Sequence, residues 1–315
     1  MPNCELLSNF IRGLLNREKN ERVRHIMKKC YIILAFIVAV LLIAMPAMAQ
    51  TKGAEEVNLK DNGKKPATEA SQEELAKAAQ NPIANMISIP LQNNFNFNVG
   101  PKNEMQYVGN LQPVIPINAT ENWNVITRTI IPFVSQPELG PNSGDVFGLG
   151  DIQFTAFLSP AKPGGFIWGV GPIVQMPSGT DQSIGQGKWA AGPSAVALRM
   201  DGRWVYGGLV NYLSSFAGQH DRGAVSQWLI QPFINYNLPD GWYLTTSPII
   251  TANMMAESSQ RWTVPVGGGV GKIVHMGKLP LNLQLAGYYT VEHPDAGPEW
   301  SIRFQIQLLL PKSLL

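Results

Sequence analysis

WSIRFQIQLLL, residues Trp300–Leu310, is the stretch that decides the fold, because apolar and polar side chains alternate along it. The apolar members are Trp300, Ile302, Phe304, Ile306, Leu308 and Leu310. Successive side chains of a β-strand point to opposite faces, so this strand has one apolar and one polar face. The pattern recurs along most of the chain, behind an export signal. We therefore predict an all-β fold, a transmembrane antiparallel β-barrel of about 12 strands, with lipid outside and a polar lumen inside.

Residues 27–49 have the three parts of a secretory signal peptide. A basic start at 27–29 (MKK) precedes an uncharged apolar run at 30–44, and AMA at 47–49 is a small-x-small cleavage motif. We expect cleavage after Ala49. Residues 1–26 are charged and irregular, and we interpret them as a mis-assigned upstream extension, with translation starting at Met27. The alternative is an uncleaved anchor, because the apolar stretch is nearly long enough to span a bilayer.

Cysteine content and charge exclude several classes of function. Both cysteines, Cys4 and Cys30, precede the cleavage point, so we expect no disulfide or thiol chemistry in the mature chain. Removing the 7 Lys/Arg and 3 Asp/Glu of residues 1–49 from the totals of 24 and 22 leaves 17 basic and 19 acidic residues, a net charge of −2. This balance predicts no nucleic-acid partner. We also predict no cofactor and no metal site.

Residues 50–82 differ in composition from the remainder. Residues 50 to about 80 are rich in Lys, Glu, Ala and Asn and contain no aromatic residue. SQEE at 71–74 resembles a capping box, which predicts a short helix through Ala79. We interpret 50–82 as a periplasmic tail carrying that helix, with plain disorder as the alternative. The barrel is expected over 83–315.

Twelve strands are expected, an even number typical of bacterial barrels. Their predicted bounds are 86–99, 105–117, 123–134, 148–159, 165–176, 189–200, 203–214, 225–238, 242–252, 262–273, 280–291 and 300–310. Short connections such as 201–202 and 239–241 alternate with mostly longer ones such as 177–188. Barrels of this class place tight turns in the periplasm and long loops outside, so both termini are expected to be periplasmic.

Tryptophans occur at the predicted strand starts, on both sides of the barrel. Trp123, Trp204 and Trp242 follow short turns, whereas Trp189, Trp262 and Trp300 follow long loops. A tryptophan ring is apolar but its N–H needs a polar partner, which favours the membrane–water interface. We predict that these six residues anchor the barrel at its two interfaces.

The alternation also predicts which side chains line the lumen. The selectivity candidates are Gln92, Asn94, Gln112, Arg128, Asp151, Asn211, Gln231, Asn235, Gln284, Arg303 and Gln305. This set is mainly amide with few charges. Apolar residues are also expected to point inward, namely Ile130, Val134, Ile173, Leu209 and Ile249. They indicate either a path for apolar molecules or ordinary packing inside a narrow barrel.

Prolines interrupt the strand pattern at many positions. They are Pro90, Pro113, Pro116, Pro132, Pro172, Pro193, Pro232, Pro248 and Pro265. Because proline cannot donate to a ladder, each predicts either a bulge or an early strand end. The sequence leaves both possibilities open.

Two local motifs and the histidines point away from catalysis. GGGVGK at 267–272 resembles a phosphate loop, but its spacing is one residue short and Ile273 replaces the Ser/Thr. GPSAV at 192–196 lacks the final glycine of a nucleophile elbow. His220, His275 and His293 are expected in loops or turns, away from any serine or ligand set.

Several blocks carry a resemblance to a known family. They are 89–95 (IPLQNNF), 112–116 (QPVIP), 128–132 (RTIIP), 148–152 (GLGDI), 167–172 (IWGVGP), 231–243 (QPFINYNLPDGWY) and 262–269 (WTVPVGGG). The chain resembles, over about residues 81–312, a proteobacterial family of candidate outer-membrane transporters. That family is related to the barrels named for the meta-pathway of phenol degradation and is often mislabelled neuromedin U. The resemblance implies passive uptake of hydrophobic or aromatic compounds and no catalytic residues.

Three functions are therefore weighed. The first is a barrel for passive transport of small solutes, tuned by Arg128, Asp151 and Arg303. The second is a structural or loop-binding barrel whose lumen is plugged by side chains or by the periplasmic tail. The third is an outer-membrane lipid-modifying enzyme, which would need a serine and a histidine at one depth. The expected partners are outer-membrane lipids, a small-molecule solute and the barrel assembly machinery. The end of the chain, LLLPKSLL, departs from the terminal aromatic residue that such barrels commonly carry.

Overall fold

The computed structural model describes residues 72–139, 144–276 and 279–310, and the predicted signal peptide and upstream extension lie outside these ranges. The regular elements are α3 Gln72–Ala79, β1 Ile87–Val99, β2 Glu104–Leu111, β3 Val114–Asn118, β4 Trp123–Gln136, β5 Val146–Leu149, β6 Ile152–Pro160, β7 Phe166–Met176, β8 Lys188–Asp201, β9 Trp204–Gly218, β10 Ser226–Asn237, η1 Pro239–Gly241, β11 Trp242–Thr246, β12 Ile250–Asn253, η2 Ser258–Gln260, β13 Trp262–Met276, β14 Leu279–Glu292 and β15 Trp300–Leu310. None of the described helices is long and apolar enough to cross a membrane.

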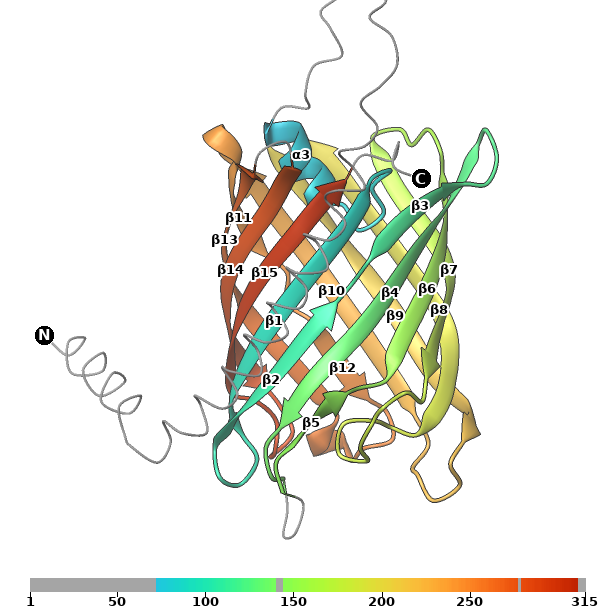
Figure 1. Cartoon of the computed structure of the whole chain (residues 1–315), viewed down its shortest axis with the longest axis vertical. Helices are drawn as coiled ribbons and strands as arrows, with labels where there is room; N and C mark the ends of the chain where they lie inside the picture. The colour runs from blue at the N-terminus through green and yellow to red at the C-terminus, as the bar shows by residue number, and fades with distance from the viewer. Residues whose placement is uncertain (1–71, 140–143, 277–278, 311–315) are drawn as a thin grey trace, which may run out of the picture. The chain divides into compact units, whose positions relative to one another are not determined.

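The strands form a closed antiparallel barrel (Figure 1). Neighbours in the barrel are neighbours in sequence, and β15 pairs with β1 to close it, from Ile87 opposite Leu310 to Phe97 opposite Trp300. Three of the expected strands are interrupted, into β2 and β3, β5 and β6, and β11 and β12. The fifteen segments therefore make twelve strand positions around the barrel. The predicted fold class is confirmed.

The interruptions occur where the sequence cannot continue a ladder. Pro113 lies between β2 and β3, and Pro248 lies between β11 and β12. The third interruption, between β5 and β6, falls at Gly150 and Asp151, where the backbone N–H of Gly150 donates to the carbonyl of Pro132 at 2.8 Å. A residue that lacks an N–H cannot donate to a neighbouring strand, so Pro113 and Pro248 end strand segments early.

Other prolines stay within continuous strands. Pro172 of β7 lies opposite Pro193 of β8. The β6–β7 ladder omits pairs between Thr155–Ile173 and Leu158–Val170, and the β8–β9 ladder omits pairs beside Pro193. The register is the same on both sides of each of these two gaps. At Pro265 the β13–β14 register shifts instead, which marks a bulge. Both outcomes that the sequence leaves open for the prolines, a bulge and an early strand end, therefore occur.

The outward face of the barrel is apolar. Side chains such as Phe154, Leu158, Val170, Val270 and Leu285 are exposed there. Trp123, Trp189, Trp204 and Trp242 are exposed near strand ends, and Trp262 and Trp300 are half-buried. Trp300 stacks on Phe97 with ring centroids 3.9 Å apart, and Trp204 contacts Tyr236 at 4.7 Å. This distribution is that of a barrel with an apolar band between aromatic belts.

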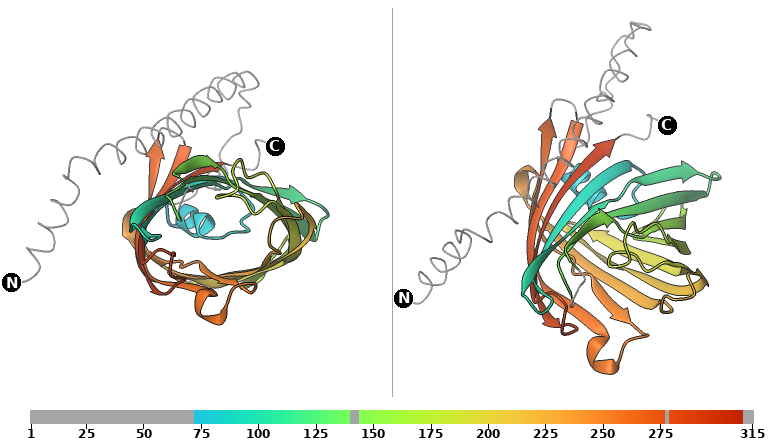
Figure 2. Two further views of the ribbon diagram at one scale, coloured as in Figure 1. Left: turned by 90° about the horizontal axis from the view of Figure 1, so that it is seen from below. Right: turned by 60° about the horizontal axis from the view of Figure 1, so that its bottom comes forward.

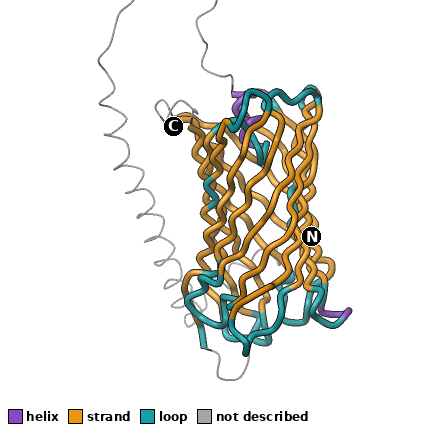
Figure 3. The backbone as a smooth tube through the Cα atoms, turned by 90° about the vertical axis from the view of Figure 1, so that its right-hand side faces the viewer, coloured by secondary structure: helices purple, strands orange, loops and turns teal. Residues whose placement is uncertain are grey.

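The two ends of the barrel differ. Helix α3 lies inside one end, where the connections are short, and the longer loops gather at the other end (Figures 2 and 3). The helix occupies the stretch where the sequence predicts one, and it lies inside the barrel end. From α3 the chain passes along the inner wall and begins β1 at Ile87.

Candidate lumen site

Helix α3 is held inside the barrel by apolar contacts on one of its faces. Leu75 and Ala76 are buried against Tyr243 of β11, Ile273 of β13 and Leu309 of β15. The Tyr243 ring lies across Gly271, where a Cβ atom would come within 2.1 Å of the ring. Its hydroxyl donates to Oδ1 of Asn282 at 2.7 Å. Glycine at this position therefore makes room for the aromatic platform on which the helix rests.

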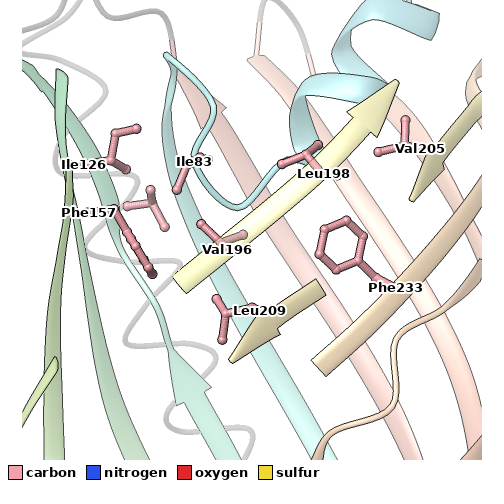
Figure 4. Packing of buried hydrophobic residues seen from close by; sticks show 9 residues of the cluster. Ile83, Ile126, Phe157, Val196, Leu198, Val205, Leu209 and Phe233 are labelled. Atoms are coloured by element: carbon pink, nitrogen blue, oxygen red, sulfur yellow. The ribbon is translucent and has the colours of Figure 1, made fainter. Parts of the chain in front are cut away.

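The segment after the helix, residues 80–86, is attached to the opposite wall. Ile83 is 3 % exposed and packs among inward-facing apolar residues of several strands (Figure 4). They are Val114, Ile126, Phe157, Val196, Leu198, Val205, Leu209 and Phe233. Burying an isoleucine in this way contributes about 1.5–3 kcal/mol. Of the five apolar residues expected to point inward, Leu209 belongs to this packed wall, whereas Ile173 is buried in a separate cluster with Ala190, Leu213 and Val225.

Polar contacts complete the attachment of this segment, which we call the lumen strap (residues 72–86, including α3). The Gln80 side-chain amide donates to Oδ1 of Asn237 at 2.9 Å, and Asn237 donates back at 3.3 Å. Gln307 donates to the carbonyl of Ala79 at 3.4 Å. A helix C-terminus leaves carbonyls without partners, and a lumen amide satisfies one of them here. From the sequence, a tail that plugs the lumen is one alternative among three, and the apolar spacing of Leu75, Ala76 and Ala79 is the signal that favours it.

A cavity of about 130 Å³ lies between the strap and the barrel wall. It is lined by Ala79, Gln80, Asn81, Pro82, Ser88, Pro90, Gln92, Gln112, Val114, Arg128, Leu209, Gln231, Phe233, Asn235, Tyr243, Thr245, Ser247, Asn282, Gln284, Arg303, Gln305 and Gln307. Eight of the eleven predicted lumen residues are in this lining: Gln92, Gln112, Arg128, Gln231, Asn235, Gln284, Arg303 and Gln305. The structure therefore brings most of the predicted set to one place.

Arg303 of β15 is fixed in the lining by two hydrogen bonds and a ring contact. Its Nε donates to Oδ1 of Asn94 at 3.0 Å, and Nη1 donates to the carbonyl of Ser247 at 2.8 Å. The guanidinium lies over the Tyr288 ring, 4.8 Å from the centroid. Ser247 precedes Pro248 at the interruption between β11 and β12, and it also accepts at its hydroxyl from Gln231 at 2.8 Å.

Arg128 of β4 is positioned by the other proline interruption. Its Nη2 donates to Oε1 of Gln112 at 2.6 Å, and Gln112 is the residue before Pro113. The backbone N–H of Gln112 donates to the carbonyl of Pro90 at 2.8 Å. Each arginine is thus held by a residue that directly precedes a strand-breaking proline. Pro113 and Pro248 thus interrupt their strands, and the residues before them, Gln112 and Ser247, accept the hydrogen bonds of the two arginines.

The remaining three predicted residues lie outside the cavity lining. Asn94 is hydrogen-bonded to two residues of the lining: its Oδ1 accepts from Arg303 Nε and from Gln92 Nε2, the latter at 3.3 Å. Asn211 of β9 is buried and hydrogen-bonded to the hydroxyl of Ser194 on β8. Asp151 holds a loop. Its carboxylate accepts from the backbone N–H groups of Gly179 at 3.0 Å and Gln186 at 2.6 Å.

The loop between β7 and β8, residues 177–187, is folded against the barrel by these contacts. Gln186 reaches two strands: it accepts from Gln175 at 2.9 Å and donates to Gln227 at 3.3 Å. Arg222 of the next long loop donates to the carbonyl of Gln182 at 2.8 Å. Within the loop, hydrogen bonds from Ser183 hold the pKa of Asp181 below its usual value. The 177–187 loop is therefore bound to strands and to a second loop at the end of the barrel opposite the strap.

Replacing Asp151 with alanine should release this loop. Both backbone N–H groups lose their charged acceptor, and hydrogen bonds to charged groups contribute about 1.5–3 kcal/mol each. Hydrogen–deuterium exchange at the Gly179 and Gln186 amides should become at least about tenfold faster. Asp221→Ala, in the neighbouring loop, is the control and should leave these two amides unchanged. Unaltered protection in the Asp151 variant would show that the loop is held by other contacts.

Neither local motif forms a catalytic arrangement. The 267–272 stretch lies within β13, so it is not followed by the helix that a phosphate loop needs. The 192–196 stretch lies within β8. No described hydrogen bond joins a histidine to a serine, and within the described ranges no three His, Cys, Asp or Glu side chains gather as metal ligands.

Comparison with known proteins shows the fold. No protein-family model and no curated protein matches the sequence. Among solved structures, the COG4313 outer membrane channel from Pseudomonas putida F1 matches with a TM-score of 0.56 at 15% identity, over 72% of this chain and 96% of that one. The chain shares the fold of an outer-membrane β-barrel. The family that the sequence resembles is not established by this likeness and stays a prediction.

Two other solved structures are more distant. Outer membrane phospholipase A from Escherichia coli matches with a TM-score of 0.38 at 13% identity, over 75% of this chain and 97% of that one. The β domain of the Bordetella autotransporter BrkA matches with a TM-score of 0.40 at 12% identity, over 70% and 98%. Scores this low carry no argument about function.

Proposed function

We propose that this chain is an outer-membrane barrel through which small, hydrophobic or aromatic solutes pass without energy input. The observation that carries the proposal is the cavity between the strap and the barrel wall, which amide and apolar side chains line together. Amides such as Gln231 and Gln284 bind polar groups, while Leu209 and Phe233 contact apolar ones. Ligand sites commonly combine mainly apolar surfaces with a few placed polar groups.

The outer surface supports a location in the outer membrane. An apolar band between aromatic belts suits lipid. The short connections lie at the strap end, so that end would face the periplasm and the long loops would face outside. Barrels of this kind depend on assembly machinery for insertion, which is the further partner that we propose.

A plugged barrel is the second candidate, and the strap is the observation that favours it. Leu75, Ala76 and Ile83 are anchored to opposite walls of one end. If the strap never leaves, the lumen conducts little and the long loops carry the function instead. A lipid-modifying enzyme has no comparable observation in its favour.

Single-channel recording of the full chain, purified folded from outer membranes, separates these candidates. We expect discrete conductance steps. We also expect benzamide to interrupt them at lower concentration than glucose, because an aromatic ring can contact Val114, Leu209 and Phe233 of the lining and a sugar cannot do so favourably. Heat-dependent gel mobility confirms in the same preparation that the barrel is folded. A folded barrel without conductance would reject the transport proposal in favour of the plugged one.

A further inference from the structure

We propose that Arg128 and Arg303 form a binding site for the carboxylate of an aromatic monocarboxylate in the lumen cavity. Its role in uptake rests on the proposed function, whereas the binding itself does not. Both guanidinium groups line the same cavity, together with amides from four strands.

The charge of the cavity is positive. Its lining contains two arginines and no aspartate, glutamate or lysine. The ion pairs within the described ranges are Lys77–Glu73 and Lys102–Glu138, so neither arginine is neutralised by a described carboxylate. Arginine stays protonated in proteins, and a charge inside a barrel is screened less than one in open water. An anion entering this cavity would therefore be stabilised, and a cation repelled.

Both guanidinium groups have donors left over. A guanidinium carries five N–H donors in a planar fork that matches a carboxylate. The structure gives Arg128 a single hydrogen bond, to Gln112, and gives Arg303 two, to Asn94 and Ser247. Those contacts fix the side chains while leaving most of the donors unused. This is the arrangement of a site that is organised before its ligand arrives.

The apolar residues in the lining define the remainder of the ligand. Val114, Leu209 and Phe233 face the same cavity as the arginines. They belong to the packed wall that holds Ile83, so they are rigidly supported. The cavity, about 130 Å³, is close to the size of an apolar cavity of about 150 Å³ that accepts benzene. A carboxylate joined to one aromatic ring would contact both the arginines and the apolar side chains of this lining.

Calorimetric titration of the detergent-solubilised full chain tests the site with two probes of the same shape. Benzoate carries the charge, and benzamide replaces it with a neutral amide. We expect benzoate to bind at least about tenfold more tightly than benzamide. Arg128→Gln and Arg303→Gln should each weaken benzoate about tenfold while changing benzamide less than about twofold. Lys162→Gln removes an exposed charge in the β6–β7 turn and should change neither.

Further measurements keep the proposal falsifiable. Arg303→Lys retains the charge but loses the fork, so it should bind benzoate with intermediate affinity, and it replaces Arg303→Gln if that variant does not fold. Equal affinity for the two probes, or benzoate binding unaffected by any arginine variant, would overturn the site. Charge-dependent binding in a barrel that does not conduct would keep the site and reject transport. Conductance without charge-dependent binding would reject the arginine site and keep the transport proposal.

Discussion

Deleting residues 72–84 will raise the single-channel conductance several-fold and leave a folded barrel. The strap crosses one end of the lumen, with Leu75 on the wall formed by β11, β13 and β15 and Ile83 on the opposite wall. Strand pairing begins only at Ile87, so the deletion removes no rung of the ladder between β1 and β15. Planar-bilayer recording measures the conductance, and heat-dependent gel mobility measures folding.

Point variants separate blockage by the strap from other effects of a deletion. Each of Leu75 and Ile83 contributes about 1.5–3 kcal/mol to docking by burial, so Leu75→Asp with Ile83→Asp should release the strap and reproduce most of the increase. Glu73→Gln is the control, because the exposed Glu73–Lys77 pair contributes little to docking. Unchanged conductance in a folded deletion variant would show that the strap is not the block.

The sequence does not predict which surface of the barrel the strap binds. The sequence indicates a helix through Ala79, but eight residues with two buried members do not specify a partner surface. The apolar residues that receive Ile83, such as Phe157 and Leu198, come from strands far apart in the sequence. Their alternation predicts that they point inward, and nothing local predicts what fills the space between them. Which segment fills that space depends on contacts between residues far apart in the sequence.

The strands themselves were predictable because one face of each must be apolar. Alternation in Trp300–Leu310 places Arg303, Gln305 and Gln307 inside, where the structure has them. Alternation alone does not predict the interruptions, because the pattern in 105–117 continues across Pro113 whereas β2 ends at Leu111 and β3 begins at Val114. Alternation likewise does not predict the contacts of Asp151, one of the residues expected in the lumen. Asp151 lies at an interruption, where the backbone is free to turn and its carboxylate meets a loop more than 25 positions away.

A single methyl group at Gly171 will disrupt the barrel. Gly171 precedes Pro172 in β7, where the β6–β7 ladder omits its pairs and the two backbones lie close together. A Cβ atom on Gly171 would come within 1.8 Å of the carbonyl oxygen of Ala156, far inside any real contact. The obstacle is backbone, so no side-chain rotation relieves it. Gly171→Ala should therefore lose several kcal/mol of unfolding free energy, of the order seen for overpacked cores or more.

Gly287→Ala is the matched control, because Gly287 also lies within a strand, β14, and a Cβ atom there would meet nothing within 4 Å. Its stability should be unchanged or slightly higher, since alanine loses less backbone entropy on folding than glycine. Urea unfolding followed by tryptophan fluorescence compares the two variants, with the fraction of heat-modifiable protein as a second readout. Equal midpoints would mean that β6 and β7 can separate beside Pro172 without cost. The unpaired positions between β6 and β7 would then tolerate a larger separation of the two strands, and the close packing at Gly171 would not be required for closure of the barrel.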